Sequence, residues 1–346
     1  MSLYQIQNTL YVMTPQAYAH LDNGTVRIDV ERETKLRVPL HHVGGMVCFG
    51  NVLISPLLMH RLAEEGRALV LLDRHGRFKA RLEGPVSGNI LLRRAQHRTA
   101  DDADTTRSLA SAMLLGKLRN SRTVLLRGAR EATDQADADV LKRTAANLAA
   151  AVRALTHAAD LDTLRGIEGE AARGYFGAIN QIIKPNLRGR FRFDGRSRRP
   201  PRDRLNALLS FLYALLMNDC RSAVEAVGLD PQLGFLHAVR PGRAALALDL
   251  QEEFRAILAD RLALTLINRG QLTESDFEER DGGAVMLGDQ GRRTVVSAWQ
   301  DRKQEELRHP LLDTKVPFAA LPLLQARILA RMLRGDVPAY TPFLAR

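Results

Sequence analysis

A histidine and a group of acidic residues lie close together in one region of the chain. His237 is followed, after a Pro-Gly pair, by a predicted helix that carries Asp249, Glu252 and Glu253 near its start. Residues three and four apart share one face of a helix, so we expect the three carboxylates to point in roughly the same direction. An imidazole beside carboxylates is a ligand set for a divalent metal ion. The alternative is a surface histidine and a solvated acidic helix start, which the helix dipole favours without any metal.

Two further features favour a functional site. Arg240 and Arg243 follow the histidine, and arginine side chains suit an anionic substrate such as a phosphate. Glu168 lies between Gly166 and Gly169, where a helix is expected to begin. Acids are common in a first helical turn, but flanking glycines also let a backbone or a substrate approach closely. Glu168 is therefore a candidate functional acid.

The first part of the chain has the pattern of β-strands. An Asn23-Gly24 pair precedes the alternating run Thr25–Val30, which is typical of a β-hairpin. Ser55 is a candidate N-cap for one short helix that reaches about Glu65. Residues 1–95 therefore predict a small β-rich domain.

After about residue 100 the apolar residues recur with a helical period, so residues 96–346 predict a larger all-α catalytic domain and an α+β fold overall. A turn signal over residues 281–291 indicates a short hairpin inserted between the helices. The strongest helical runs are Ala110–Leu118, Val140–Leu155, Glu168–Ile183, Leu205–Cys220 and Leu321–Leu333.

A basic segment, Leu187–Arg204, interrupts the helices and is rich in Arg, Gly and Pro. It interleaves Arg190 and Arg192 with Phe191 and Phe193. Such a segment can bind phosphates and stack on bases, or it can be a solvated mobile loop. The sequence leaves both interpretations open.

Charge points to a nucleic-acid partner. The chain has 346 residues, a formal net charge of +11 and mostly arginine among its basic residues, and arginine matches phosphate geometry. Cys48 and Cys220 stand in unrelated contexts, so neither a disulfide framework nor a zinc site is indicated. No phosphate-binding glycine loop occurs. No apolar run reaches the roughly 18 residues of a membrane span, and no signal peptide is evident, so we expect no membrane association and a cytoplasmic protein.

Three elements in this order resemble the CRISPR-associated integrase family Cas1, the adaptation nuclease. They are the segment around Gly166–Gly169, the segment Gly234–His237, and the acidic helix Leu248–Phe254. The resemblance extends over the whole chain, because a β-rich domain followed by a helical domain is that family's arrangement. The segments Arg240–Arg243 and Val337–Tyr340 are closest to the subtype I-C branch.

The resemblance implies a metal site and a reaction. Its metal ligands and catalytic residues would be Glu168, His237 and Glu252, which bind Mg²⁺ or Mn²⁺. Asp249 falls on another acidic position of the family, as an additional ligand or as a residue behind the ligands. The implied activity is that of a DNA endonuclease and integrase, in which a 3′-hydroxyl attacks a phosphodiester and a short foreign DNA enters a CRISPR array. Arg240 and Arg243 would hold phosphates, and Arg173 would contact DNA or the edge of the core.

The resemblance also implies partners. These are double-stranded DNA (protospacer and CRISPR repeat), a second copy of the chain paired through the β-rich domain, and a small ferredoxin-like adaptation subunit, Cas2. Two other functions remain open from the residues alone. One is a non-catalytic basic DNA-binding module, and the other is a metal-dependent phosphohydrolase that acts on small phosphate esters.

Overall fold

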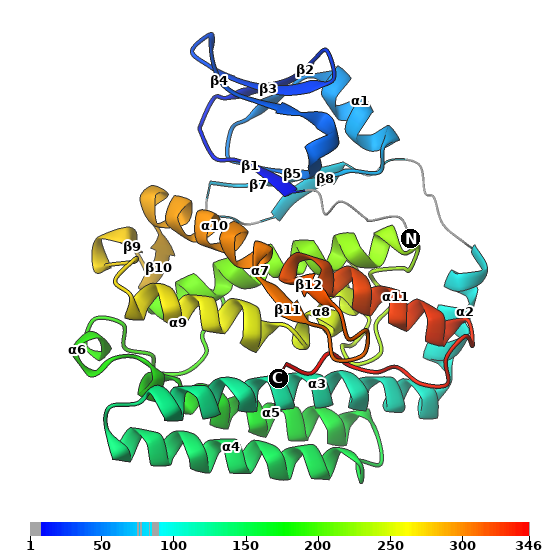
Figure 1. Ribbon diagram of the computed structural model, residues 1–346, viewed down its shortest axis with the longest axis vertical. Helices are drawn as coiled ribbons and strands as arrows, with labels where there is room; N and C mark the ends of the chain where they lie inside the picture. The colour runs from blue at the N-terminus through cyan, green and yellow to red at the C-terminus, as the bar shows by residue number, and fades with distance from the viewer. Residues whose placement is uncertain (1–7, 75, 77, 83, 85–89, 346) are drawn as a thin grey trace. The chain divides into compact units, whose positions relative to one another are not determined.

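The chain divides into two units, Met1–Ser87 and Gly88–Arg346 (Figure 1). The computed structural model describes residues 8–74, 76, 78–82, 84 and 90–345. The boundary expected after residue 95 lies inside helix α2 (Ile90–Asp101), which belongs to the second unit.

The first unit contains two four-stranded sheets and the helix α1 (Pro56–Glu64). In one sheet β1, β5 and β7 are parallel and β8 pairs with β7 in the opposite direction. In the other, β4, β3 and β2 are antiparallel and β6 runs parallel to β2. The strands are β1 (Asn8–Val12), β2 (Tyr18–Asp22), β3 (Thr25–Val30), β4 (Glu33–Pro39), β5 (Val43–Phe49), β6 (Leu53–Ile54), β7 (Ala68–Leu72) and β8 (Phe78–Leu82).

Two local predictions for this unit are confirmed. Asn23 and Gly24 both have positive φ angles, and they join β2 to β3 with Asp22 opposite Thr25. This is the backbone that a two-residue hairpin turn requires. The Ser55 hydroxyl accepts a hydrogen bond from the Leu58 amide at 3.2 Å and caps α1.

The second unit is built mainly from helices. The long helices α3, α4 and α5 lie side by side (Figure 1). Helix α7 contains the predicted helical run Leu205–Cys220, and it packs against α8, α9 and α11. The helices after α2 are α3 (Ala103–Glu131), α4 (Gln135–Leu155), α5 (Leu161–Gly177), α6 (Pro185–Arg188), α7 (Arg204–Ala226), α8 (Ala245–Glu252), α9 (Arg261–Asn268), α10 (Asp289–Gln304) and α11 (Leu321–Leu333). Short 3₁₀ turns are η1 (Leu40–His42), η2 (Ile179–Ile182), η4 (Glu274–Asp276) and η5 (Phe318–Ala320).

Strands also occur in the second unit, so it is helical but not all-α. Strands β9 (Phe277–Arg280) and β10 (Ala284–Leu287) form the hairpin that the turn signal indicated. A second hairpin, β11 (Glu306–Arg308) with β12 (Lys315–Pro317), was missed, because each of its strands is only three residues long. None of the described helices combines the length and the apolar character that a bilayer crossing requires.

The helix predicted after His237 is not continuous. Helix α8 ends at Glu252, and a π-helical turn, η3 (Arg255–Asp260), separates it from α9. A π-helical turn changes which residues share a face, and such turns are frequent at functional sites. The residues of α9 therefore do not continue the faces of α8.

Candidate active site

His237 lies in the loop between α7 and α8, and the buried carboxylate of Asp249 holds it there. Asp249 Oδ2 accepts hydrogen bonds from the amides of Phe235 (2.6 Å) and Leu236 (3.0 Å). Asp249 Oδ1 accepts from the His237 amide at 2.9 Å and pairs with His237 Nδ1 at 2.6 Å. Since a carboxylate only accepts hydrogen bonds, the neutral imidazole has its proton on Nδ1 and its lone pair on Nε2. A ligating histidine is typically fixed in this way by a second residue.

Glycine is required at the start of this loop. A Cβ atom on Gly234 would lie 2.6 Å from Asp249 Oδ2 and 2.8 Å from the Ala245 carbonyl carbon. Both distances are too short for any side chain, so Gly234 lets the loop close over α8. Helix α5 also holds the His237 loop, because the Arg165 guanidinium donates two hydrogen bonds to the Leu236 carbonyl at 3.1 and 2.9 Å.

Glu168 projects from the middle of α5. The expectation that a helix begins at Glu168 is wrong, because α5 begins at Leu161 and the Asp160 side chain caps it by accepting from the Thr163 amide at 2.7 Å. The neighbouring glycines, Gly166 and Gly169, do not interrupt the helix, and a Cβ on either would meet open space. They keep the surface beside Glu168 open.

Glu252, the last residue of α8, is a buried carboxylate among positive charges. Its Oε1 lies 2.7 Å from Arg255 Nη1 and 3.9 Å from His237 Nε2. Its Oε2 lies 2.7 Å from Lys117 Nζ, an ion-pair contact without good hydrogen-bond geometry. Burial alone would raise the pKa of this carboxyl, but Arg255, Lys117 and His237 outweigh burial and hold the pKa well below its ordinary value. Glu252 therefore stays ionised.

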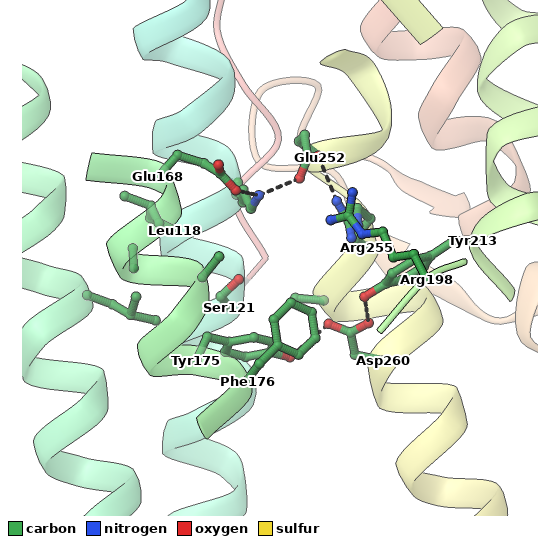
Figure 2. Close-up of a pocket in the computed structure, with 15 residues that line it drawn as sticks. Leu118, Ser121, Glu168, Tyr175, Phe176, Arg198, Tyr213, Glu252, Arg255 and Asp260 are labelled. Carbon is green, nitrogen blue, oxygen red and sulfur yellow. Dashed lines mark hydrogen bonds and ion pairs between the residues drawn. The ribbon is translucent and has the colours of Figure 1, made fainter. Parts of the chain in front are cut away.

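Lys117 of α3 links the two acids, and the sequence did not identify it. Its ammonium contacts Glu168 Oε1 and Glu252 Oε2, so it stands between carboxylates from α5 and α8. Figure 2 shows Glu168 and Glu252 facing each other across this position. The signal that could have indicated it is a group of polar residues, Lys117, Asn120 and Ser121, on the apolar face of a long helix.

A divalent cation suits this donor set, although the side chains as they stand do not enclose one. Two carboxylates and an imidazole nitrogen are ligands that Mg²⁺ and Mn²⁺ accept. Glu252 Oε2 is buried without a hydrogen-bond donor of good geometry, and it already faces a positive charge. Within the described part of the chain, no three His, Cys, Asp or Glu side chains group closely enough to hold a metal ion together. The Lys117 ammonium instead lies where a metal ion would contact Glu168 and Glu252, which we call the acid pair.

A pocket continues from the acids to a buried aromatic end. Figure 2 shows Tyr175, Phe176 and Asp260 at the end away from Glu168 and Glu252. Asp260 Oδ2 accepts from the Tyr175 hydroxyl at 2.9 Å, and Oδ1 accepts from the Tyr213 hydroxyl at 2.5 Å. Burial raises the pKa of the Asp260 carboxyl and of the Tyr175 and Tyr213 hydroxyls.

Glu253 does not share the direction of Glu252. Its carboxylate is fully buried and accepts hydrogen bonds from the Tyr340 hydroxyl, the Phe343 amide (2.7 Å) and Gln325 Nε2 (3.1 Å). Burial raises its pKa to about 8, and these hydrogen bonds only partly oppose the shift. The expectation that Asp249, Glu252 and Glu253 point the same way is therefore wrong. Asp249 faces the His237 loop, Glu252 faces Lys117, and Glu253 faces the segment around Phe343.

Arginines predicted to contact DNA lie at the surface or near it. Arg173 and Arg240 are exposed and Arg243 is half-buried. Arg190 and Arg192 are largely exposed, at 65% and 75% of the side chain, and both lie beside an acid, Glu274 at 3.7 Å and Asp194 at 2.7 Å respectively.

The aromatic residues of the basic segment are not available to stack on bases. Phe191 and Phe193 are each 2% exposed. Phe191 packs edge-on against Phe277 with ring centroids 6.0 Å apart, and Phe193 lies 5.8 Å from the ring of Phe176. These two rings anchor the segment to the core, and its exposed arginines, Arg190 and Arg192, stay available to a ligand.

Comparisons with known proteins agree with this arrangement. The family model described as CRISPR associated protein Cas1 matches residues 10–301. A protein of Moorella thermoacetica named CRISPR-associated endonuclease Cas1 1 is 55% identical over 344 residues, which cover 99% of this chain and 100% of that protein. Among solved structures, a casposase bound to its integration product superposes with a TM-score of 0.82 at 21% identity, over 97% of this chain and 93% of that one. A chain of a Cas6-RT-Cas1–Cas2 complex superposes with a TM-score of 0.83 at 22% identity, over all of this chain and 37% of that one. At these identities the two structures show likeness of fold.

Proposed function

The chain belongs to the Cas1 family of CRISPR-associated proteins, and from this premise we propose that it is a divalent-metal-dependent DNA endonuclease and integrase. Its role would be to insert short foreign DNA into a CRISPR array. The observation that carries the proposal is that Glu168 and Glu252 contact the same ammonium, that of Lys117, and that His237 Nε2 lies 3.9 Å from Glu252 Oε1. The excess of arginine supports a DNA substrate.

In this proposal the ligands of the metal are Glu168, His237 and Glu252. A bound Mg²⁺ or Mn²⁺ would stabilise negative charge on the phosphate oxygens during displacement. Asp249 keeps the Nε2 lone pair of His237 directed at the site, and it is a positioning residue more than a ligand, because both its oxygens already accept two hydrogen bonds.

Two reactions are open to such a site. When water attacks the phosphorus, a new P–O bond forms, the P–O bond to the leaving 3′ or 5′ oxygen breaks, and the strand is cut. When the 3′-hydroxyl of a second DNA attacks, the same exchange joins two strands. Arg240 and Arg243 lie shortly after His237 in the chain and would hold the phosphates.

The proposed partners are duplex DNA, a second copy of the chain and a Cas2 subunit. The fold shared with a chain of a Cas1–Cas2 complex supports the last of these. Pairing of two copies through the β-rich domain and membership of subtype I-C stay predictions. Crosslinking between two copies of the chain tests the pairing, crosslinking to Cas2 tests that partner, and the gene content beside the CRISPR array tests the subtype.

A strand-transfer assay tests the proposed function. The full chain, with its Cas2 partner, is incubated with a short duplex that has free 3′-hydroxyls and a repeat-containing target, in Mn²⁺ or in chelator. We expect products only with the metal, and none from Glu168→Ala or His237→Ala, while both variants still bind DNA. Glu170→Ala is the matched control, because Glu170 is an exposed acid on the same helix. Full activity of Glu168→Ala would contradict the proposal.

One observation favours a second function, a non-catalytic DNA-binding module. Lys117 and Arg255 already neutralise the acid pair, as they would in a purely structural cluster. Calorimetric titration with Mn²⁺ separates the two functions, since only the enzyme requires a bound cation.

A further inference from the structure

Lys117 lies between Glu168 and Glu252, the two acids of the proposed metal site. It extends from α3, its side chain is only 12% exposed, and its ammonium contacts Glu168 and Glu252 at once. Glu168 lies on α5 and Glu252 on α8, so this one ammonium connects three helices. The positive charge of Lys117 offsets the repulsion between these two carboxylates, as a bound metal ion would.

The other cations near Glu252 do not occupy this position. Arg255 pairs with the opposite oxygen, Oε1, at 2.7 Å, and its guanidinium lies over the ring of Tyr213, 4.2 Å from the ring centroid. It can therefore stay in place when Oε2 acquires another partner. His237 approaches Glu252 Oε1 only at 3.9 Å. Among the described contacts, Lys117 alone joins the two acids.

A divalent cation on the same two acids would bring like charges together. The ammonium and the metal would both need Glu252 Oε2 and the Glu168 carboxylate, and positive charges a few ångströms apart repel strongly in a partly buried site. The flexible four-carbon stem of Lys117 allows its ammonium to move away from the acids. The guanidinium of Arg255 is less free to move, because it lies over the ring of Tyr213.

We propose that Lys117 is a positioning residue that holds Glu168 and Glu252 together and competes with the divalent cation for them, so that it sets the metal affinity of the site. This inference rests on the proposed metal site. The competition has a direction that a merely structural role would not have: removing the charge of Lys117 destabilises the protein in chelator but makes the metal bind more tightly. Loss of a purely structural contact would weaken both.

The test compares Mn²⁺ affinity, measured by calorimetry on the full chain without DNA, in the natural protein and in Lys117→Met. We expect the dissociation constant of Lys117→Met to be lower by at least about fivefold, which is the scale of ordinary coupling between two ligands. Its melting temperature should fall in chelator and should rise more on adding Mn²⁺ than that of the natural protein. Lys117→Arg keeps the charge and should bind Mn²⁺ within about twofold of the natural protein.

Two controls keep the result interpretable. Lys142→Met removes the same charge from an exposed position on α4 and should leave Mn²⁺ affinity unchanged. Lys117→Gln is a second neutral variant in case Lys117→Met does not fold. Unchanged or weaker Mn²⁺ binding by the neutral variants would overturn the inference.

Mn²⁺ binding by the natural protein distinguishes failure of the proposed metal site from failure of the role proposed for Lys117. If the natural protein binds Mn²⁺ and His237→Ala does not, the metal site stands and the neutral variants alone decide the role of Lys117. If the natural protein binds no Mn²⁺, the metal site fails, and the competition fails with it.

Discussion

Replacing Asp249 with asparagine would break the support of His237 with almost no change in shape. Asp249 Oδ2 accepts from the Phe235 and Leu236 amides, and Oδ1 accepts from the amide and ring of His237. An asparagine has one acceptor oxygen and one NH₂ donor, so either orientation places NH₂ against two N–H donors. At least two hydrogen bonds are lost.

The expected loss of stability follows from this count. Hydrogen bonds to a charged group contribute about 1.5–3 kcal/mol each, so two of them amount to about 3–6 kcal/mol. Movement of the loop will recover part of this, and we expect Asp249→Asn to lower the free energy of unfolding by about 3 kcal/mol. If the NH₂ group faces the ring, Nδ1 must accept and the proton moves to Nε2, which removes the lone pair that a metal needs. Substitutions of such supporting residues typically cost 10–100-fold in metal affinity, about the loss expected here.

Urea unfolding and Mn²⁺ calorimetry on the same preparations measure both effects. Glu170→Gln, at an exposed acid on α5, is the control and should change neither value. If Asp249→Asn bound Mn²⁺ as the natural protein does and lost less than about 0.5 kcal/mol, the account of how His237 is oriented would be refuted.

Three other predictions concern separate features. Burial raises the pKa of Glu253 to about 8, so the folded state favours the protonated acid and the stability from this group is lost as pH rises through about 8. Melting temperatures measured from about pH 5 to about pH 9 should show this decline, and Glu253→Gln should flatten it. A Glu253→Gln profile identical to that of the natural protein would contradict the burial argument. Phe191→Ala should lower the free energy of unfolding by about 3–5 kcal/mol in urea, because the ring is 2% exposed; a change below about 1 kcal/mol would mean that the ring is not part of the core. Affinity for duplex DNA should fall steeply between about 50 and about 200 mM salt, and Arg240→Ala should reduce the log–log slope by about 1; a flat dependence would exclude an arginine-lined DNA surface.

Local signals in the sequence were sufficient for much of the fold. The Asn23-Gly24 turn, the Ser55 cap and the helix Leu321–Leu333 all depend on residues close in the chain, and the structure confirms each of them. Residue type and spacing made His237 and the acids candidates, but the choice of Glu168, His237 and Glu252 as ligands came from the resemblance to the Cas1 family.

Features that depend on tertiary packing could not be predicted. The apolar period of α3 shows which face is buried but not that Lys117 meets acids from α5 and α8. Nor does the run after His237 reveal the π-helical turn that lies between α8 and α9. Phe191 and Phe193 look like residues of a mobile loop until their partners, Phe277 and Phe176, are known.

Anomalous diffraction from crystals of the full chain grown with Mn²⁺ tests most directly whether Glu168, His237 and Glu252 share one cation. We expect a single strong peak about 2.0–2.3 Å from a Glu168 oxygen, His237 Nε2 and a Glu252 oxygen, with the Lys117 ammonium moved away from Glu168 and Glu252. A peak elsewhere, or no peak while Lys117 still bridges the two acids, would contradict it.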